Sequence, residues 1–164
     1  MRAFILACFT LVLMAAPVTN ANDSAKDKAL INAMLNHLHA AAANADWPEY
    51  FGLYADDATF LGTDKTERWD MPTFKSYAAQ TKGWKYTMTE RHIDLSADGN
   101  AAWFDELLWN DAYGVSRGTG ALIRGDSGWK IVQYHLTFPM PNDLAKRFTE
   151  EIQTFEKNAA AQEK

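Results

Sequence analysis

The feature that most constrains the fold is a long strand-like segment, residues 128–138 (GWKIVQYHLTF). β-Branched and aromatic residues dominate it, and Pro139 and Pro141, which cannot donate to a sheet ladder, end it. Alternate side chains of a strand point to opposite faces. One face would carry Trp129, Ile131, Gln133, His135 and Thr137. The other would carry Lys130, Val132, Tyr134, Leu136 and Phe138. The polar pair Gln133 and His135 among apolar neighbours predicts that the first face lines a binding cavity.

Three further strand-like segments precede this one and are separated by turns. They cover residues 84–95, 101–111 and 113–124. An additional short strand is expected at residues 58–62, followed by an ordered loop at residues 63–70. The second half of the chain is therefore predicted to be an antiparallel meander.

Helical patterns occupy the first half of the chain. Apolar residues recur with a period near 3.6 over residues 29–45, after a polar and frayed stretch at residues 22–28. Asp46 and Asp70 are suitable N-caps for two shorter helices, of which the first would end near residues 55–57. A polar helix and tail follow at residues 143–164. Helices followed by an antiparallel meander predict an α+β domain with a pocket between the layers.

Residues 1–21 have the pattern of a cleaved secretory signal, with Arg2, an apolar run and a cut after Ala21. A retained N-terminal anchor is the alternative. The sequence thus predicts a periplasmic or secreted protein whose single mature domain is residues 22–164. No other apolar run is long enough to span a bilayer, so no membrane partner is expected after cleavage.

The composition excludes several kinds of function. Cys8 is the only cysteine and lies in the signal, so no disulfide or thiol chemistry is expected in the mature domain. The formal net charge of −5, without a basic cluster, disfavours a nucleic-acid partner. No phosphate-binding or dinucleotide motif is present, and no cofactor is expected.

Several short segments, in this order, resemble the SnoaL-like branch of the nuclear transport factor 2-like (NTF2-like) superfamily. They are YADDATF at residues 54–60, GTD at 62–64, ERW at 67–69, WFDE at 103–106, RGTG at 117–120 and the segment 128–142. The resemblance covers roughly residues 29–145. It implies a cone-shaped fold in which a strongly curved antiparallel sheet wraps N-terminal helices, with a deep pocket and usually a homodimer.

Members of this superfamily include ketosteroid isomerases, polyketide cyclases, dehydratases and association domains, so the fold alone does not supply the function. The aspartate that serves as general base in the isomerase aligns with Gly62. The expected base is therefore missing, and Asp64, two residues further on, is the nearest substitute.

Four residues are the candidates for catalysis: His135, Glu106, Arg117 and Asp64. His135 is an imidazole on the face predicted to line the pocket. Asp105 and Glu106 are adjacent on a strand, so only one can face inward, and the resemblance favours Glu106. An inward carboxylate needs a partner, and Arg117 on the next strand is the expected one. A purely structural Glu106–Arg117 pair remains the alternative.

The candidates for ligand binding are mostly aromatic. They are Trp47, Tyr50, Tyr54, Trp69, Phe74, His92 and Gln133. His37 and His39 lie two residues apart on a helix, do not face each other, and are expected to have ordinary surface or boundary roles. No metal site is expected, because no histidine pair has ligand spacing.

Three functions remain open from the sequence. The first is binding of a small hydrophobic or polar-aromatic molecule. The second is a proton-transfer enzyme, an isomerase, cyclase or dehydratase, with His135 or Asp64 as base. The third is an assembly module that forms a homodimer through the face carrying Tyr134 and Leu136.

Overall fold

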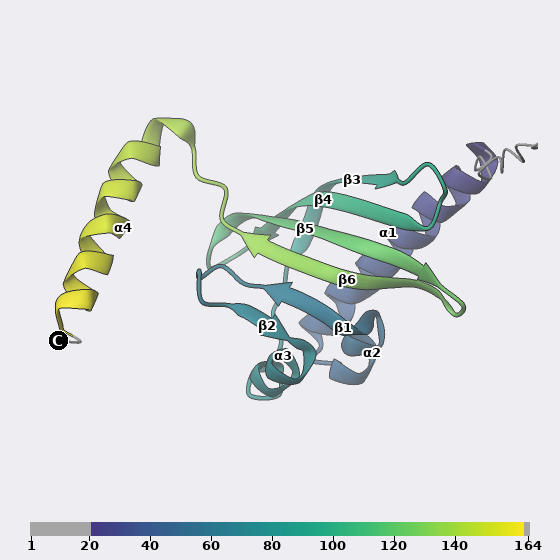
Figure 1. Ribbon diagram of the computed structural model, residues 1–164, viewed down its shortest axis with the longest axis horizontal. Coiled ribbons are helices and arrows are strands. Elements are labelled where there is room, and N and C mark those ends of the chain that lie inside the picture. The colour runs from purple at the N-terminus through teal and green to yellow at the C-terminus, as the bar shows by residue number, and fades with distance from the viewer. Residues whose placement is uncertain (1–20, 163–164) are drawn as a thin grey trace, which may run out of the picture.

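The computed structural model describes residues 21–162, in which a curved six-stranded sheet is covered on one face by helices (Figure 1). The segment predicted to be a signal peptide lies, up to residue 20, outside the described residues. The strand order is β2-β1-β6-β5-β4-β3. Neighbouring strands are antiparallel except β1 and β6, which are parallel. Among the described residues, no helix is long and apolar enough to cross a membrane.

Four helices accompany the sheet: α1 (Ala21–Ala43), α2 (Trp47–Gly52), α3 (Met71–Ala78) and α4 (Asn142–Gln162). The two predicted caps are confirmed. An oxygen of Asp46 accepts a hydrogen bond from the backbone N–H of Glu49 at 3.4 Å, and one of Asp70 accepts from that of Thr73 at 2.9 Å. Each cap satisfies a backbone donor that the first helical turn leaves unpaired.

The first helix begins earlier than the sequence pattern suggested. The stretch at residues 22–28, expected to fray, is helical because Asp27 anchors it to the sheet. The buried carboxylate of Asp27 pairs with Arg124 and accepts a hydrogen bond from the indole of Trp129 at 3.4 Å. A buried charge needs such partners, and here they fix the helix against the far end of the sheet.

The strands are β1 (Tyr54–Leu61), β2 (Arg68–Asp70), β3 (Thr87–Leu95), β4 (Ala101–Asn110), β5 (Gly114–Gly125) and β6 (Gly128–Thr137). Two segments differ from expectation. Residues 54–57 belong to β1 rather than to the end of α2, since Tyr54 pairs with Ile131 of β6. The predicted loop contains β2, in which Trp69 pairs with Phe60 of β1.

A bulge in β6 corrects the prediction of its faces. Gln133 pairs with Ala121 of β5 but Ile131 pairs with Leu122, so Val132 is an extra residue between them. The extra residue interrupts the alternation of side chains. Trp129 and Ile131 are buried as expected, but beyond the bulge Tyr134 is buried and Gln133 is exposed. The C-terminal half of β6 therefore faces the opposite way from the prediction.

Candidate functional site

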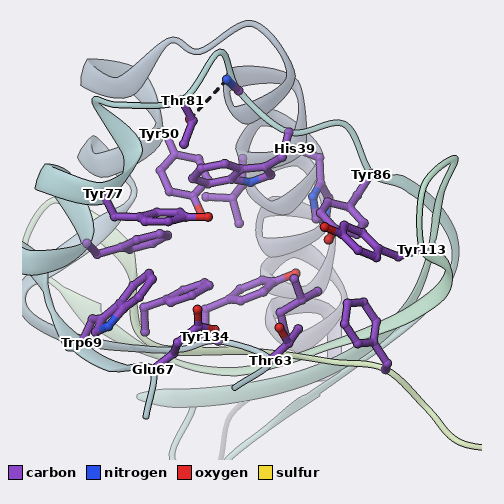
Figure 2. A pocket seen from close by; sticks show the side chains of 18 residues that line it. His39, Tyr50, Thr63, Glu67, Trp69, Tyr77, Thr81, Tyr86, Tyr113 and Tyr134 are labelled. Atoms are coloured by element: carbon purple, nitrogen blue, oxygen red, sulfur yellow. Dashed lines mark hydrogen bonds between the residues drawn. The ribbon is translucent and has the colours of Figure 1, made fainter. Parts of the chain in front are cut away.

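A cavity of about 340 Å³ lies between the helices and the concave face of the sheet (Figure 2). Aromatic side chains form most of its wall. They include Tyr50, Phe60, Trp69, Phe74, Tyr77, Trp84, Tyr86, Tyr113, Tyr134 and Phe138. Within the wall, the rings of Phe60 and Phe74 stack with centroids 3.9 Å apart. Such a wall favours flat apolar molecules.

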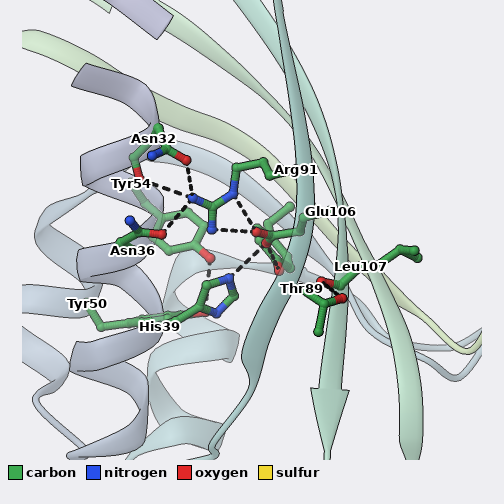
Figure 3. Close-up of polar contacts among 10 residues, drawn as sticks. Asn32, Asn36, His39, Tyr50, Tyr54, Thr89, Arg91, Glu106 and Leu107 are labelled. Carbon is green, nitrogen blue, oxygen red and sulfur yellow. Dashed lines mark hydrogen bonds and ion pairs between the residues drawn. The ribbon is translucent and has the colours of Figure 1, made fainter. Parts of the chain in front are cut away.

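Behind His39 and Tyr134, two residues of the cavity wall, lies a buried carboxylate, Glu106 of β4 (Figure 3). Its Oε1 accepts a hydrogen bond from the hydroxyl of Tyr134 at 2.8 Å and lies 2.9 Å from Nε2 of His39. Its Oε2 accepts from Nε of Arg91 at 2.8 Å and lies 2.6 Å from Nη2 of the same side chain. We call Glu106, His39, Arg91 and Tyr134 the Glu106 cluster. His39 and Tyr134 also line the cavity, so the cluster reaches the binding space.

The helix α1 holds Arg91 in place. Nη1 of Arg91 donates to the backbone oxygen of Asn32 at 3.1 Å, and to the side-chain oxygens of Asn32 and Asn36 at 2.8 Å each. The sequence pattern predicted Arg117 as the partner of Glu106, and that prediction is wrong. Arg117 pairs across the sheet with Leu107, one residue beyond Glu106, and so points to the outer face, where it is exposed. Glu106 does face inward, as the resemblance implied.

Opposite Glu106 on β5 lies Gly118, and the site requires a glycine there. A Cβ at this position would lie 2.3 Å from the hydroxyl of Tyr134 and 2.9 Å from Oε1 of Glu106. Only a residue without a side chain lets the tyrosine hydroxyl reach the carboxylate.

The environment of Glu106 acts on its pKa in two directions. Burial alone would raise the pKa of Glu106, because it disfavours the charged form. The hydrogen bond and charge of His39, the charge of Arg91 and the bond from Tyr134 more than offset this, so the pKa lies below its usual value. Burial also raises the pKa of Tyr134, with the nearby charge of Glu106 adding to the effect. At neutral pH the cluster thus holds an ionised Glu106 and a protonated Tyr134.

A second carboxylate, Glu67, lines the cavity beside Gly62. A Cβ at Gly62 would lie 2.0 Å from Oε2 of Glu67, so the carboxyl of Glu67 fills the space that a side chain at residue 62 would need. Oε2 accepts a hydrogen bond from the backbone N–H of Asp64 at 3.1 Å. Among the described residues, no group is hydrogen-bonded to the other oxygen, Oε1. Glu67 therefore has an oxygen available to a ligand.

Asp64 lies outside the cavity wall. Its exposed carboxylate accepts hydrogen bonds from the hydroxyl and the backbone N–H of Thr66 at 2.6 and 2.8 Å, which lower its pKa. Asp64 thus orders the β1–β2 loop, and its neighbours Gly62 and Thr63 line the cavity in its place.

Of the five aromatic residues predicted to bind a ligand, three line the cavity and two pack behind its wall. Tyr50, Trp69 and Phe74 line the cavity. Trp47 and Tyr54 pack behind Tyr50, and the hydroxyls of Tyr50 and Tyr54 are 3.0 Å apart.

Three predicted polar residues lie on the outer face of the sheet. His135 pairs with Thr119 and Gln133 with Ala121, both on the side away from the cavity. His92 is exposed and lies 2.8 Å from a carboxylate oxygen of Glu90. The bulge at Val132 explains the first two displacements.

His39, Glu67, Arg91 and several wall aromatics were missed as site residues. His39 lies at the boundary of the core, one of the two roles predicted for it, but its contact with the buried Glu106 was not foreseen. A signal was present: His39 follows the buried Leu35 by four residues and therefore borders the apolar stripe of α1. Within residues 21–162 no group of histidine, cysteine and carboxylate side chains has the arrangement of a metal site.

Fold and site together define the class of this protein, an α+β cone of the NTF2-like type with an aromatic cavity inside it. The comparison with family models identifies the branch. The model described as "SnoaL-like domain" matches residues 31–141, and the chain belongs to this family. A comparison with curated protein sequences finds no match.

Solved structures show the same fold at low sequence identity. An NTF2-like protein of unknown function from Pseudomonas putida KT2440 has a TM-score of 0.62 and 15% identity, over 73% of this chain and 91% of that one. A proposed dehydratase of the NTF2-like family from Streptomyces avermitilis has a TM-score of 0.58 and 13% identity, over 72% and 99%. The association domain of C. elegans CaMKII has a TM-score of 0.59 and 13% identity, over 71% and 99%. These likenesses establish the fold alone.

Proposed function

We propose that this SnoaL-like protein binds one small, flat and mainly apolar molecule in its cavity. The observation that carries the proposal is the cavity of about 340 Å³, whose wall is mostly aromatic and carries hydroxyl, imidazole and carboxyl groups among the rings. This size and this lining are typical of small-molecule sites. Edges and faces of the rings would select a planar molecule, and the polar groups would orient it.

Two polar positions define what the molecule should carry. His39 lies in the cavity wall, and its contact with the ionised Glu106 fixes the orientation of the imidazole. Glu67 lies at the β1–β2 wall and offers an unpaired carboxylate oxygen. A ligand with a hydroxyl group near Glu67 and a second polar group near His39 fits both positions.

The proposal can be tested with a panel of planar hydroxy and carbonyl compounds in a thermal-shift screen, together with native mass spectrometry of the freshly purified protein. A binder should lose about tenfold or more in affinity in a His39→Ala variant, as expected when a buried polar contact is removed. His92→Ala, a histidine on the outer face, is the matched control and should bind normally. If no compound shifts the melting temperature and no bound molecule is found, the proposal fails.

A second candidate is proton transfer next to a carbonyl group, and a specific observation favours it. The carboxyl of Glu67 occupies the space beside Gly62, the position where the resemblance places the isomerase base. In this reaction a C–H bond of the substrate breaks as the carboxylate takes the proton. An enolate forms, and the same carboxyl returns the proton to another carbon. Tyr86, whose pKa is raised by burial, stays protonated and can donate to the enolate oxygen.

This candidate is tested by proton exchange in deuterated water, followed by NMR on any carbonyl compound that the screen shows to bind. Glu67→Gln should slow the exchange by about 100-fold or more while the compound still binds. Asp64→Asn is the matched control, and exchange should continue at the normal rate. The proton-transfer candidate fails if a bound carbonyl compound does not exchange its protons with the solvent, or exchanges them equally fast in Glu67→Gln. Binding alone would then be the function.

A further inference from the structure

The C-terminal helix α4 has an apolar stripe that the described part of its own chain leaves half-buried at Leu144 and Phe148 and exposed at Ile152 and Phe155. At 100° per residue, Leu144, Phe148, Ile152 and Phe155 fall on one side of the helix. None of them is buried, and Phe155 is 74% exposed. In Figure 1 the helix stands apart from the sheet. Its ion pair to the body, between Lys65 and Glu156, is exposed and worth little.

The linker before α4 directs the helix away from its own sheet. Residues 138–141 have the sequence FPMP, in which each proline restricts the residue before it to extended conformations. Phe138 is fixed at the start of the linker, because its ring packs against that of Tyr113 at 5.2 Å. A short and stiff linker of this kind hinders the reversal that would lay α4 on the outer face of its own chain.

The outer face of the sheet carries exposed apolar side chains over a matching length. We call Trp103, Leu107 and Trp109 of β4, with Val115 and Ile123 of β5, the outer strip. Asp105 of β4 and Arg117 of β5 lie among them on the same face. Trp103 is 51% exposed, and Trp109 and Val115 lie opposite each other at 48% and 50% exposure. From Trp103 to Trp109 the strand rises by about 20 Å. The stripe from Leu144 to Phe155 spans about 17 Å.

We propose that α4 of one chain packs on the outer strip of a second copy, and that the two chains exchange their helices. Charges on one side of the two features agree with this pairing. Glu156 flanks one side of the stripe, and the ion pair between Arg147 and Glu151, 3.7 Å apart, flanks the other. On the sheet, β3 carries Glu90 and Asp94, while β5 and β6 carry Arg117 and Lys130. With Glu156 toward β5 and β6 it faces cations, so this flank is complementary.

Interface size favours exchange over other arrangements. A stable interface buries roughly 800 Å² per partner, which is more than a pair of isolated four-residue stripes supplies. In a two-fold dimer each chain contributes both a helix and a strip, and the buried area doubles. A membrane is disfavoured as the occupant because Glu151 and Glu156 border the stripe, where an interfacial helix carries lysine or arginine.

Light scattering on the full chain over a range of concentrations gives the first test. The protein should dimerise, and Phe148→Asp should raise the dimer Kd by about 30-fold or more, since it places a charge in a buried contact. Val115→Asp, on the strip, should have the same effect. Gln153→Asp changes the side of α4 that points away from the stripe and should not alter the Kd. Circular dichroism melts verify that each variant is folded.

Cross-linking then tests the arrangement itself. In a Cys8→Ser background, a chain with Ile152→Cys is mixed with a chain with Val115→Cys under mild oxidation, and a disulfide-linked heterodimer is expected. Replacing Ile152→Cys by Gln153→Cys, on the side of α4 away from the stripe, should abolish it. The proposal is overturned if the full chain stays monomeric, if Phe148→Asp leaves the dimer intact, or if Ile152→Cys chains link mainly to each other. Binding of the full chain to phosphatidylglycerol vesicles that Phe148→Asp abolishes, with no dimer in solution, would also overturn it.

Discussion

At the residue scale, the Glu106 carboxylate has polar partners on both of its oxygens. His39 and Tyr134 contact Oε1, and Arg91 contacts Oε2. A buried ion pair of this kind is weak evidence for net stability, because desolvation consumes much of the attraction. Removing one member of the pair is strongly destabilising, because the other charge is then left in the interior without a partner.

The substitution Glu106→Gln should therefore destabilise the fold by roughly 3–5 kcal/mol, since it leaves Arg91 buried without its counter-ion. Urea denaturation at neutral pH measures this value. Asp105→Asn, on the adjacent exposed position, is the matched control and should change stability by less than about 0.5 kcal/mol. Equal effects of the two substitutions would show that Glu106 is not held as described.

The pH dependence of stability follows from the same residue. The pKa of Glu106 is lower in the folded protein than in the unfolded chain, so the unfolded chain binds more protons. The stabilisation is complete above the unfolded pKa and is lost as the pH falls through the folded pKa. We expect the acid limb of a stability–pH curve to be less steep in Glu106→Gln than in the wild type. Parallel acid limbs would contradict the assignment.

Gly118 provides a steric test of the same site. In Gly118→Ala the new Cβ would lie 2.3 Å from the hydroxyl of Tyr134, so the ring must move away from Glu106. We expect a loss of roughly 1–3 kcal/mol, typical of overpacking. In Gly52→Ala the new Cβ meets no atom within 4 Å, and this control should be neutral or slightly stabilising. Thermal melts of both variants provide the comparison.

At the scale of elements, the β6 bulge decides which residues reach the cavity. Without the extra residue Val132, His135 would point inward and Leu136 outward. With it, Leu136 joins the cavity wall and Gln133 lies in solvent.

A pair of substitutions in β6 tests this register. Leu136→Glu should cost roughly 1–3 kcal/mol, since it places a carboxylate against the aromatic wall without a partner. Gln133→Glu should cost less than about 0.5 kcal/mol, because the side chain is already exposed. Urea denaturation measures the loss of stability in each variant. A larger loss in Gln133→Glu than in Leu136→Glu would show that β6 alternates regularly and that Gln133 faces the cavity.

The helix caps and the long strands could be predicted from the sequence because residues close in the chain determine them. Asp46 and Asp70 cap helices within three residues of themselves, and the long strands carry their own pattern. The partners of Glu106 depend on tertiary structure: His39 is 67 residues away and Arg91 is 15. The bulge at Val132 depends on the pairing of β5 with β6, which single-strand alternation cannot indicate.

At the scale of the whole molecule, the cavity and α4 are separate parts. Residues from α1, α2, β1, α3 and β6 all contribute to the cavity wall, so a ligand contacts most of the body. The helix α4 contributes no lining residue and buries none of its side chains. Ligand binding should therefore change the hydrogen exchange of the segments around the cavity, and the proposed helix exchange should change that of α4.

Hydrogen exchange followed by mass spectrometry can separate the two. A ligand at 100 times its Kd stabilises the folded state by about 2.7 kcal/mol, and this should slow exchange in residues 54–61, 71–78 and 128–137. Exchange in residues 142–162 should be unaffected by ligand but should slow as the protein concentration rises, since only the dimer covers α4. Protection of residues 142–162 by ligand at a concentration where the protein is monomeric would instead place α4 over the cavity mouth of its own chain.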